Sequence, residues 1–324
     1  METVKTLAHY PSVQPFKWSG KDFLRGDEFS KAELEHLLQL AIHLKQLQKD
    51  GQVYQPLKGK TLGMIFDKAS TRTRVSFEVG IYQLGGIGMY LNGKELQLGR
   101  GEPISDTAKV LSRYVDGIMI RTHAHSIVEE LAAHASIPII NGLTDLFHPC
   151  QALADLQTIL EHKGKLKGVK VAYIGDGNNV AHSLVLSAAK LGMDIRVATP
   201  AGYEMDETIC RQTQELADAH GSKLLATTDP ELAVYGADII YTDVWTSMGF
   251  EEENEIRLKA FAGYQVNEKL ARLAHKDYSF MHCLPAHRDE EVTADVIDGP
   301  HSVVFDQAEN RLHAQKAIMA TLLV

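Results

Sequence analysis

Hydrophobic and polar positions along the chain switch repeatedly between the pattern of buried strands and the pattern of amphipathic helices. Short apolar runs predict strands at 61–66, 116–121, 137–142, 168–176, 194–199, 237–243 and 278–284. Apolar residues at helical spacing predict helices from about 31 to 50, at 71–84 and 105–115, after Pro149, and at 179–191, 206–219, 265–274 and 309–324. The glycine-rich stretch 85–106 is predicted to be a loop.

The ends of two helices carry recognisable signals. Ser30 and Glu33 form a capping box, and Gly51 stands where that helix should stop. Pro149 suits the first turn of the long helix that follows it.

Strands that alternate with helices are typical of parallel sheets covered by helices on both faces. Two such series, joined by the helix after Pro149, predict an α/β protein with two doubly wound parallel-sheet domains. Ligands of such sheets bind beyond the carboxyl ends of the strands. Five chemically distinctive segments fall there: 67–74, 121–125, 175–179, 243–249 and 282–288.

Composition narrows the class of protein. The 324 residues exceed the size of most single cores, and 44% are hydrophobic. A net charge of −9 argues against nucleic acid as a partner. Three widely spaced cysteines favour neither a disulfide framework nor a zinc site. No membrane-length apolar run and no signal-peptide pattern is seen, so we expect a cytoplasmic protein without membrane contact.

The segment Ser70-Thr71-Arg72-Thr73-Arg74 places hydroxyls and two arginines at the start of a helix. A helix N-terminus already carries partial positive charge, so cations are unfavourable there unless an anion binds. Backbone N–H groups, hydroxyls and guanidinium groups all donate hydrogen bonds to phosphate. We therefore favour phosphate binding over a simple serine cap with exposed arginines.

Further polar residues lie at strand ends or at the long helix. Arg121 ends an apolar strand, and it is either a surface ion-pair residue or a second ligand of the same anion. His148 and Gln151 flank the start of the long helix, where they could polarise a carbonyl group without a metal.

The loop "GDGNNVAHS" only weakly matches a dinucleotide-binding loop. Val180 occupies the third glycine position, and Thr199 stands where an acid should bind ribose. We therefore disfavour a nucleotide-dependent dehydrogenase. Asn178 and Asn179 could instead bind a small ligand.

Two later segments complete the candidate chemistry. Asp243 precedes Ser247-Met248-Gly249, which is either a solvated loop or a lid that brings charge to an amine. Cys283 follows the last strand; the alternatives are an inert thiol or a Cys–His metal pair, and the spacing matches no standard zinc site.

Together, these motifs resemble the carbamoyltransferase family, in order and from about residue 61 to the C-terminus. Ser70–Arg74 is similar to its carbamoyl-phosphate loop, and 148–151 to its His-Pro-x-Gln element. Asp243, residues 247–249 and His282-Cys283-Leu284-Pro285 resemble the parts that select ornithine.

The resemblance implies an architecture. A carbamoyl-phosphate domain would span 1–148, an ornithine domain 149–308, and helix 309–324 would pack back on the first domain. It also implies a homotrimer or a multiple of trimers, in which Gln97 would reach the site of a neighbouring subunit. A long glycine-rich loop would otherwise be unusual.

The resemblance further implies transfer of a carbamoyl group from carbamoyl phosphate to the δ-amine of L-ornithine, in arginine metabolism, and we expect a role in arginine biosynthesis. No cofactor and no metal are expected. Catalysis would fall to Cys283, Arg121, His148 and Arg72. Carbamoyl phosphate would contact Ser70, Thr71, Arg72, Thr73, Gln97, Arg121, His148, Gln151, Cys283, Leu284 and Arg311. Ornithine would contact Asn179, Asp243, Ser247 and Met248.

Other acceptors remain as alternatives. Aspartate as second substrate would need a cation where this chain has Gln97 and Cys283. Putrescine would have no use for groups that bind an α-carboxylate and an α-amine.

Overall fold

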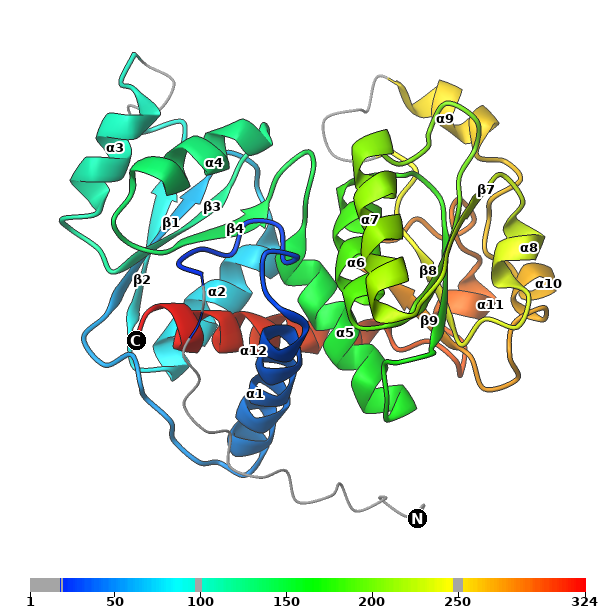
Figure 1. Ribbon diagram of the computed structural model, residues 1–324, viewed down its shortest axis with the longest axis horizontal. Coiled ribbons are helices and arrows are strands. Elements are labelled where there is room, and N and C mark those ends of the chain that lie inside the picture. Colours follow the sequence, from blue (N-terminus) through cyan, green and yellow to red (C-terminus); the bar gives the residue numbers. More distant parts are fainter. Residues whose placement is uncertain (1–17, 19, 97–100, 247–252) are drawn as a thin grey trace.

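Two α/β lobes lie side by side in the computed structural model, which describes residues 18, 20–96, 101–246 and 253–324 (Figure 1). The first lobe holds a parallel sheet in the order β2-β1-β3-β4. Its strands are β1 (Thr61–Phe66), β2 (Ile87–Asn92), β3 (Gly117–Arg121) and β4 (Ile139–Leu143). Its helices are α1 (Lys31–Lys49), α2 (Thr71–Gln83), α3 (Ile104–Leu111) and α4 (His125–His134).

Successive side chains of these strands enter two different cores. Ile65 and Ile118 pack in the cluster that contains α3 and α4 residues, whereas Met64 and Met119 join the cluster that contains α1 and α2 residues. This is the alternation expected of a sheet buried on both faces.

The second lobe holds a parallel sheet in the order β7-β6-β5-β8-β9. Its strands are β5 (Lys170–Ile174), β6 (Asp194–Ala198), β7 (Leu224–Thr227), β8 (Ile239–Thr242) and β9 (Ser279–His282). One face is covered by α6 (Asn179–Lys190) and α7 (Glu207–His220). Shorter helices surround the other core: α8 (Pro230–Val234), α9 (Asn254–Ala260), α10 (Glu268–Ala271) and α11 (Ala294–Ile297).

Two long helices connect the lobes. α5 (Pro149–Lys163) crosses from one sheet to the other, and α12 (Val304–Leu322) returns from the second lobe to pack on α1, α2 and α5 (Figure 1). α12 therefore begins beside β9 at the edge of the second sheet and ends within the first lobe. The capping box at Ser30, the stop at Gly51 and Pro149 in the first turn of α5 are confirmed.

Some sequence predictions were wrong. The stretch 85–106 is not all loop, because residues 87–92 form β2, parallel to β1. Its glycines concealed the strand, yet they are needed there: a Cβ on Gly86 would lie 2.9 Å from the Ile81 side chain. The last helix begins at Val304, five residues before the predicted 309, and the predicted helix 265–274 shrinks to α10.

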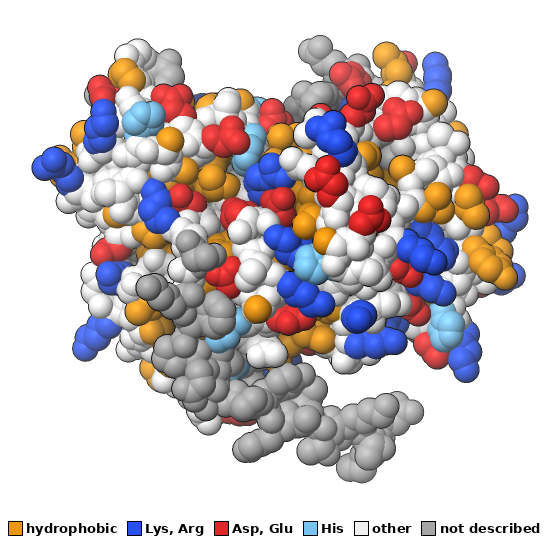
Figure 2. Space-filling view, viewed as in Figure 1, with side chains coloured by type: hydrophobic (Ala, Val, Ile, Leu, Met, Phe, Trp, Pro, Cys, Tyr) orange, Lys and Arg blue, Asp and Glu red, His pale blue; other side chains and the backbone are white. Residues whose placement is uncertain are grey.

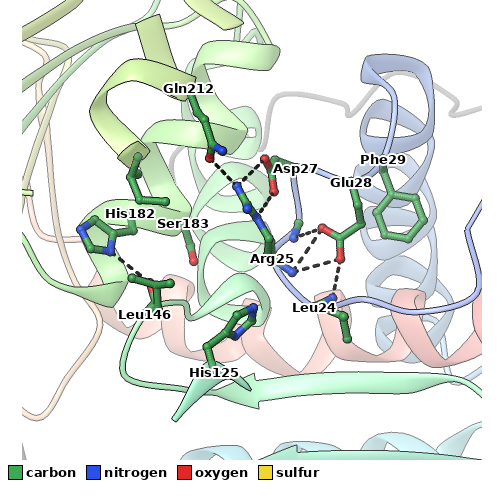
Figure 3. Close-up of polar contacts among 12 residues, drawn as sticks. Leu24, Arg25, Asp27, Glu28, Phe29, His125, Leu146, His182, Ser183 and Gln212 are labelled. Carbon is green, nitrogen blue, oxygen red and sulfur yellow. Dashed lines mark hydrogen bonds and ion pairs between the residues drawn. The ribbon is translucent and has the colours of Figure 1, made fainter. Parts of the chain in front are cut away.

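A short segment before α1 connects the two lobes through polar contacts (Figure 3). The Arg25 guanidinium donates to Gln212 Oε1 of α7 at 2.7 Å and lies over the Phe147 ring, 4.8 Å from its centroid. Lys190, at the end of α6, donates to the Phe29 carbonyl at 2.6 Å. These contacts fix how the second lobe faces the first.

On the face of the molecule drawn in Figure 2, neither acidic nor basic side chains form one dominant patch. Acidic and basic side chains are interspersed there, in keeping with a modest net charge of −9. Within the described ranges, no helix is both long and apolar enough to span a membrane.

Candidate active site

The carboxyl ends of strands from both sheets open onto one cavity of about 350 Å³. The described residues that the resemblance assigns to catalysis or to a substrate all line it: Ser70, Thr71, Arg72, Thr73, Arg121, His148, Gln151, Asn179, Asp243, Cys283, Leu284 and Arg311. Arg74 and Asn178, also candidates on sequence grounds, do not. Gln97, Ser247 and Met248 lie outside the described residues. The predicted convergence of strand ends is therefore found between the lobes.

The first turn of α2 forms one wall of the cavity. Ser70 is its N-cap, and its Oγ accepts a hydrogen bond from the Thr73 backbone N–H at 3.2 Å. The turn contains no acidic residue, so its N–H groups and partial positive charge face the cavity without an internal anion. This is a preformed anion site.

The guanidinium groups of Arg72, Arg121 and Arg311 converge on the same cavity, and none has a carboxylate partner among the residues that the structure describes. Arg121 is only 7% exposed, and its Nε has no hydrogen-bond partner among the described residues. Burial, together with Arg311 and Arg72, lowers the pKa of Arg121 to about 9. The ion-paired arginines of the described chain are all elsewhere: Arg25, Arg74, Arg257, Arg272 and Arg288. The mutual repulsion would be relieved by a bound anion.

A buried network orients Gln151 and Arg311. Asp155 is fully buried and accepts hydrogen bonds from Gln151 Nε2 at 2.8 Å, Gln307 Nε2 at 2.7 Å and the Tyr241 hydroxyl at 3.1 Å. Since the Gln151 amide nitrogen is bound to Asp155, its Oε1 is left to accept from Arg311 Nη1 at 2.7 Å. Arg311 also donates to Thr73 Oγ1 at 3.2 Å. The network connects α5, α12 and α2.

Opposite the arginines, Asp243 and Cys283 are joined directly. The Cys283 thiol donates to Asp243 Oδ1 at 2.9 Å, and Asn178 Nδ2 donates to Oδ2 at 3.0 Å. Desolvation and the adjacent Asp243 carboxylate raise the pKa of Cys283 well above its usual value. A nucleophilic cysteine needs the thiolate form, so this environment does not suit Cys283 as a nucleophile. Its thiol instead holds the Asp243 carboxylate through a hydrogen bond.

A buried histidine, His282, supports the loop after β9 through a hydrogen bond. The Leu284 backbone N–H donates to His282 Nδ1 at 2.9 Å, and the other ring nitrogen faces Glu291 Oε1 at 3.1 Å. Nδ1 of His282 therefore acts as a hydrogen-bond acceptor, and Nε2 is the ring nitrogen that carries the proton toward Glu291. Leu284 has a φ of 58°, an uncommon conformation for leucine, and its carbonyl accepts from Arg72 Nη2 at 2.7 Å.

His148 lies between the two walls. Burial and the neighbouring Arg311 and Arg121 lower its pKa well below the usual value for histidine. Its backbone N–H donates to Ser183 Oγ on α6 at 2.8 Å, which fixes the start of α5 against the second lobe. A neutral imidazole here can donate a hydrogen bond without adding to the positive charge.

Comparison with known proteins accounts for this geometry. Residues 21–161 match the family model of the aspartate/ornithine carbamoyltransferase carbamoyl-P binding domain, and residues 167–322 match that of its Asp/Orn binding domain. The chain belongs to the aspartate/ornithine carbamoyltransferase family. The two matched ranges correspond to the two lobes.

Family members with high identity cover nearly the whole chain. A relative from Oceanobacillus iheyensis named ornithine carbamoyltransferase is 62% identical and covers 96% of this chain and 97% of its own. The ornithine carbamoyltransferase structure from Pyrococcus furiosus is 57% identical, with a TM-score of 0.91 and coverage of 94% and 97%. The anabolic enzyme structure from Campylobacter jejuni is 40% identical, with a TM-score of 0.87 and coverage of 94% and 99%.

Sequence reasoning missed some residues of this carbamoyltransferase site. Lys68 lines the cavity, and burial together with Arg121 lowers its pKa. Its position two residues before Ser70 was a usable hint. The apolar lining was also missed: Ala69, Leu143, Val180, Val244 and Pro285. Asn178 caps α6 and binds Asp243, and it does not line the cavity.

Two clusters in the described part of the chain have the spacing of metal ligands: Asp243 with His282 and Cys283, and His287 with Glu290 and Glu291. In the first, both ring nitrogens of His282 already have protein partners. A metal there would break the contacts that support the loop after β9.

The buried Asp155 predicts a distinct pH dependence of stability. Burial raises its pKa to about 7, against about 3.9 in an unfolded chain. Between these values the native state holds a proton that the unfolded state releases, so this residue lowers stability as pH rises from 4 to 7. Relative to Asp155→Asn, the wild-type free energy of unfolding should fall by up to roughly 4 kcal/mol over that range. Urea titrations of both proteins at several pH values measure it; parallel curves would contradict the assignment.

Proposed function

We propose that this protein is an ornithine carbamoyltransferase, which transfers the carbamoyl group of carbamoyl phosphate to the δ-amine of L-ornithine to give L-citrulline and phosphate. The observation that carries the proposal is that one cavity holds two different sets of groups. Arg121 and Arg311 are buried and Arg72 is half-buried, and none of them has a carboxylate partner among the described residues; the Asp243–Cys283 pair comes from the second lobe. The first suits a phosphorylated donor and the second suits an amine.

Carbamoyl phosphate would bind along the α2 wall. The N–H groups of the first turn, the Ser70, Thr71 and Thr73 hydroxyls, Arg72 and Arg121 would surround the phosphate. Arg121 and neutral His148 would donate to the carbamoyl oxygen as charge develops on it. Gln151 would act differently from the sequence-based interpretation: its Nε2 is bound to Asp155, so the atom turned toward the cavity is Oε1. This oxygen already accepts from Arg311 and would accept from the carbamoyl NH₂ group with its second lone pair.

Ornithine would bind against the second lobe. The Asp243 carboxylate would accept a hydrogen bond from the α-amine, and Asn179 would face the α-carboxylate. Ser247 and Met248 remain part of this proposal on sequence grounds. The Cys283 thiol and Leu284 would lie beside the reacting carbon and the attacking nitrogen.

The reaction needs no covalent enzyme intermediate. The neutral δ-amine attacks the carbamoyl carbon, a C–N bond forms and the carbon becomes tetrahedral. The C–O bond to phosphate then breaks, phosphate leaves with the bonding electrons, and one of its oxygens takes the amine proton. Holding both reactants in line can contribute roughly 7–11 kcal/mol to lowering the barrier.

A substrate panel tests the proposal. Purified protein is incubated with carbamoyl phosphate and L-ornithine, L-aspartate or putrescine, and the carbamoylated products are quantified. We expect citrulline at a rate at least tenfold above either other product. Equal use of aspartate or putrescine, or no product, would overturn it.

A dehydrogenase is disfavoured by a specific contact. The loop after β5 would have to open for the phosphates of a dinucleotide, yet Gly177 is packed against the next loop. A Cβ built on Gly177 would lie 2.3 Å from the Met205 backbone nitrogen. The loop after β5 is therefore packed closely against the backbone of Glu204 and Met205.

Removing the Cys283 thiol should affect the two substrates unequally. In Cys283→Ala we expect the KM for ornithine to rise by roughly 10-fold, because a hydrogen bond to a charged group contributes about 1.5–3 kcal/mol. Carbamoyl-phosphate affinity should change less than 3-fold. Steady-state kinetics and calorimetry measure the two effects, with Cys210→Ala as a matched control outside this cavity. The reverse pattern would reject the placement.

The physiological setting is part of the proposal. We propose a role in arginine biosynthesis, supported by similarity to the anabolic enzyme from Campylobacter jejuni. We propose a cytoplasmic location, which agrees with three free cysteines, Cys150, Cys210 and Cys283.

We propose that the protein assembles as a trimer or a multiple of trimers. Support comes from an apolar face on α2 and the edge strand β2, where Val75, Val79, Tyr82, Ile87 and Met89 are exposed. Exposed edge strands and apolar patches of this kind are typical of subunit contacts. Gln97, which follows β2, would then enter a neighbour's site.

A further inference from the structure

Another cavity, of about 280 Å³, lies where α1, α2 and α12 meet. Lys316, Gln48 and Gln83 contribute polar groups to its lining, and Leu44, Leu47 and Val53 contribute apolar side chains. None of these residues lines the cavity between the lobes. Among the described residues that line it, only Lys316 carries a charged group.

Lys316 is a buried cation with neutral partners. It is 4% exposed, and Nζ donates to Gln48 Oε1 at 3.1 Å and to Gln83 Oε1 at 2.9 Å. Within the described ranges it forms no ion pair, whereas two lysines of α1 that face α12 do: Lys45 with Glu161 at 2.8 Å and Lys49 with Glu309 at 4.0 Å. Burial lowers the pKa of Lys316 to about 8, and no acidic group opposes that shift.

This arrangement is costly unless the charge is compensated. A buried ammonium loses hydration, and an apolar side chain of similar volume would fill the helix junction at lower cost. Two amide oxygens satisfy two of the three Nζ–H donors and leave the charge itself unbalanced. A bound anion would supply the missing charge.

The lining also indicates the class of anion. Because Gln48 and Gln83 turn their oxygens toward Lys316, their amide NH₂ groups are free to donate to a ligand. One cation with neutral donors suits a single negative charge, and Leu44, Leu47 and Val53 offer an apolar wall. We propose that this cavity binds a small monocarboxylate with a short apolar body, with its carboxylate on Lys316.

The site has a direct structural link to the substrate cavity. Lys316 lies on α12 with Arg311, and Gln83 ends α2, whose first turn holds Arg72. Tyr82 belongs both to this cavity and to the apolar face proposed for assembly, so binding is measured on the assembled full-length protein.

Calorimetric titration with sodium butyrate tests the proposal, with butyramide as the uncharged analogue. We expect one butyrate per chain, no detectable butyramide binding, and at least a tenfold loss of butyrate affinity in Lys316→Met. Arg72→Gln, which alters the substrate cavity, should bind butyrate as the wild type does. Gln83→Leu, which keeps the cation, should also weaken binding, and it serves if Lys316→Met does not fold.

Three results would overturn the proposal. These are no butyrate binding, equal binding by wild type and Lys316→Met, or binding that is lost in Arg72→Gln and kept in Lys316→Met. The last result would place butyrate in the substrate cavity instead.

Discussion

Replacing Arg72 by glutamine is expected to lower kcat/KM for carbamoyl phosphate by roughly 10³-fold or more. Loss of one donor to developing charge typically costs about 10²–10³ in rate. Here the substitution also removes a full positive charge from the phosphate wall and the donor to the Leu284 carbonyl. The loss should appear in kcat as well as KM, because charge on the leaving phosphate increases in the transition state.

Arg74 provides the matched control for this variant. It lies two residues further along α2, yet it stacks over the Tyr90 ring at 3.9 Å and pairs with Glu78 at 3.5 Å. It does not line the cavity. Arg74→Gln should keep kcat/KM within about 5-fold of wild type, since exposed ion pairs contribute little. Equal losses in both variants would show that the charge of the helix start, and not the position of Arg72, matters.

Replacing Asp243 by asparagine is expected to lower kcat/KM for ornithine by roughly 10²–10³-fold. The carboxylate is buried, holds the Cys283 thiol and would face the α-ammonium group of ornithine. Breaking a buried charge pair from one side costs about 3–5 kcal/mol. Carbamoyl-phosphate affinity should stay near wild type, because the arginine wall is unchanged.

The control for this variant is Asp206→Asn. Asp206 caps α7 and accepts from the Thr208 N–H at 2.8 Å, outside the cavity. Asparagine caps helices about as well as aspartate, so stability and kinetics should be preserved. Steady-state kinetics with each substrate varied in turn compare the two. If Asp243→Asn lowered kcat/KM for carbamoyl phosphate more than kcat/KM for ornithine, the assignment of Asp243 to the ornithine side of the cavity would be wrong.

The sequence predicted those parts of the molecule in which local pattern and tertiary position agree. β1 was predicted at its observed bounds, because an uninterrupted apolar run is typical of a strand buried on both faces. β2 was missed, because its short apolar run lies between glycines in a stretch that resembles a loop, and its side chains are not buried. Its pairing with β1 is a long-range property that no local pattern contains.

The same distinction applies to the site. Ser70, Arg121 and Asp243 could be proposed because each lies at or just beyond the carboxyl end of a strand, and all three line the cavity. Asp155 and Gln307 could not be found in this way, since they act through a network that forms only when α5, α12 and β8 pack together. The role of Gln151 also depends on that network, because Asp155 determines which end of its amide faces the substrate.

Binding of carbamoyl phosphate alone tests the central claim most directly, namely that the unpaired guanidinium groups exist to bind a phosphorylated donor. Calorimetric titration of the wild-type protein should show one molecule bound per chain in the absence of ornithine. Arg72→Gln should lose at least 10-fold in affinity, and Arg74→Gln should bind like wild type. Unchanged affinity in Arg72→Gln would contradict the account.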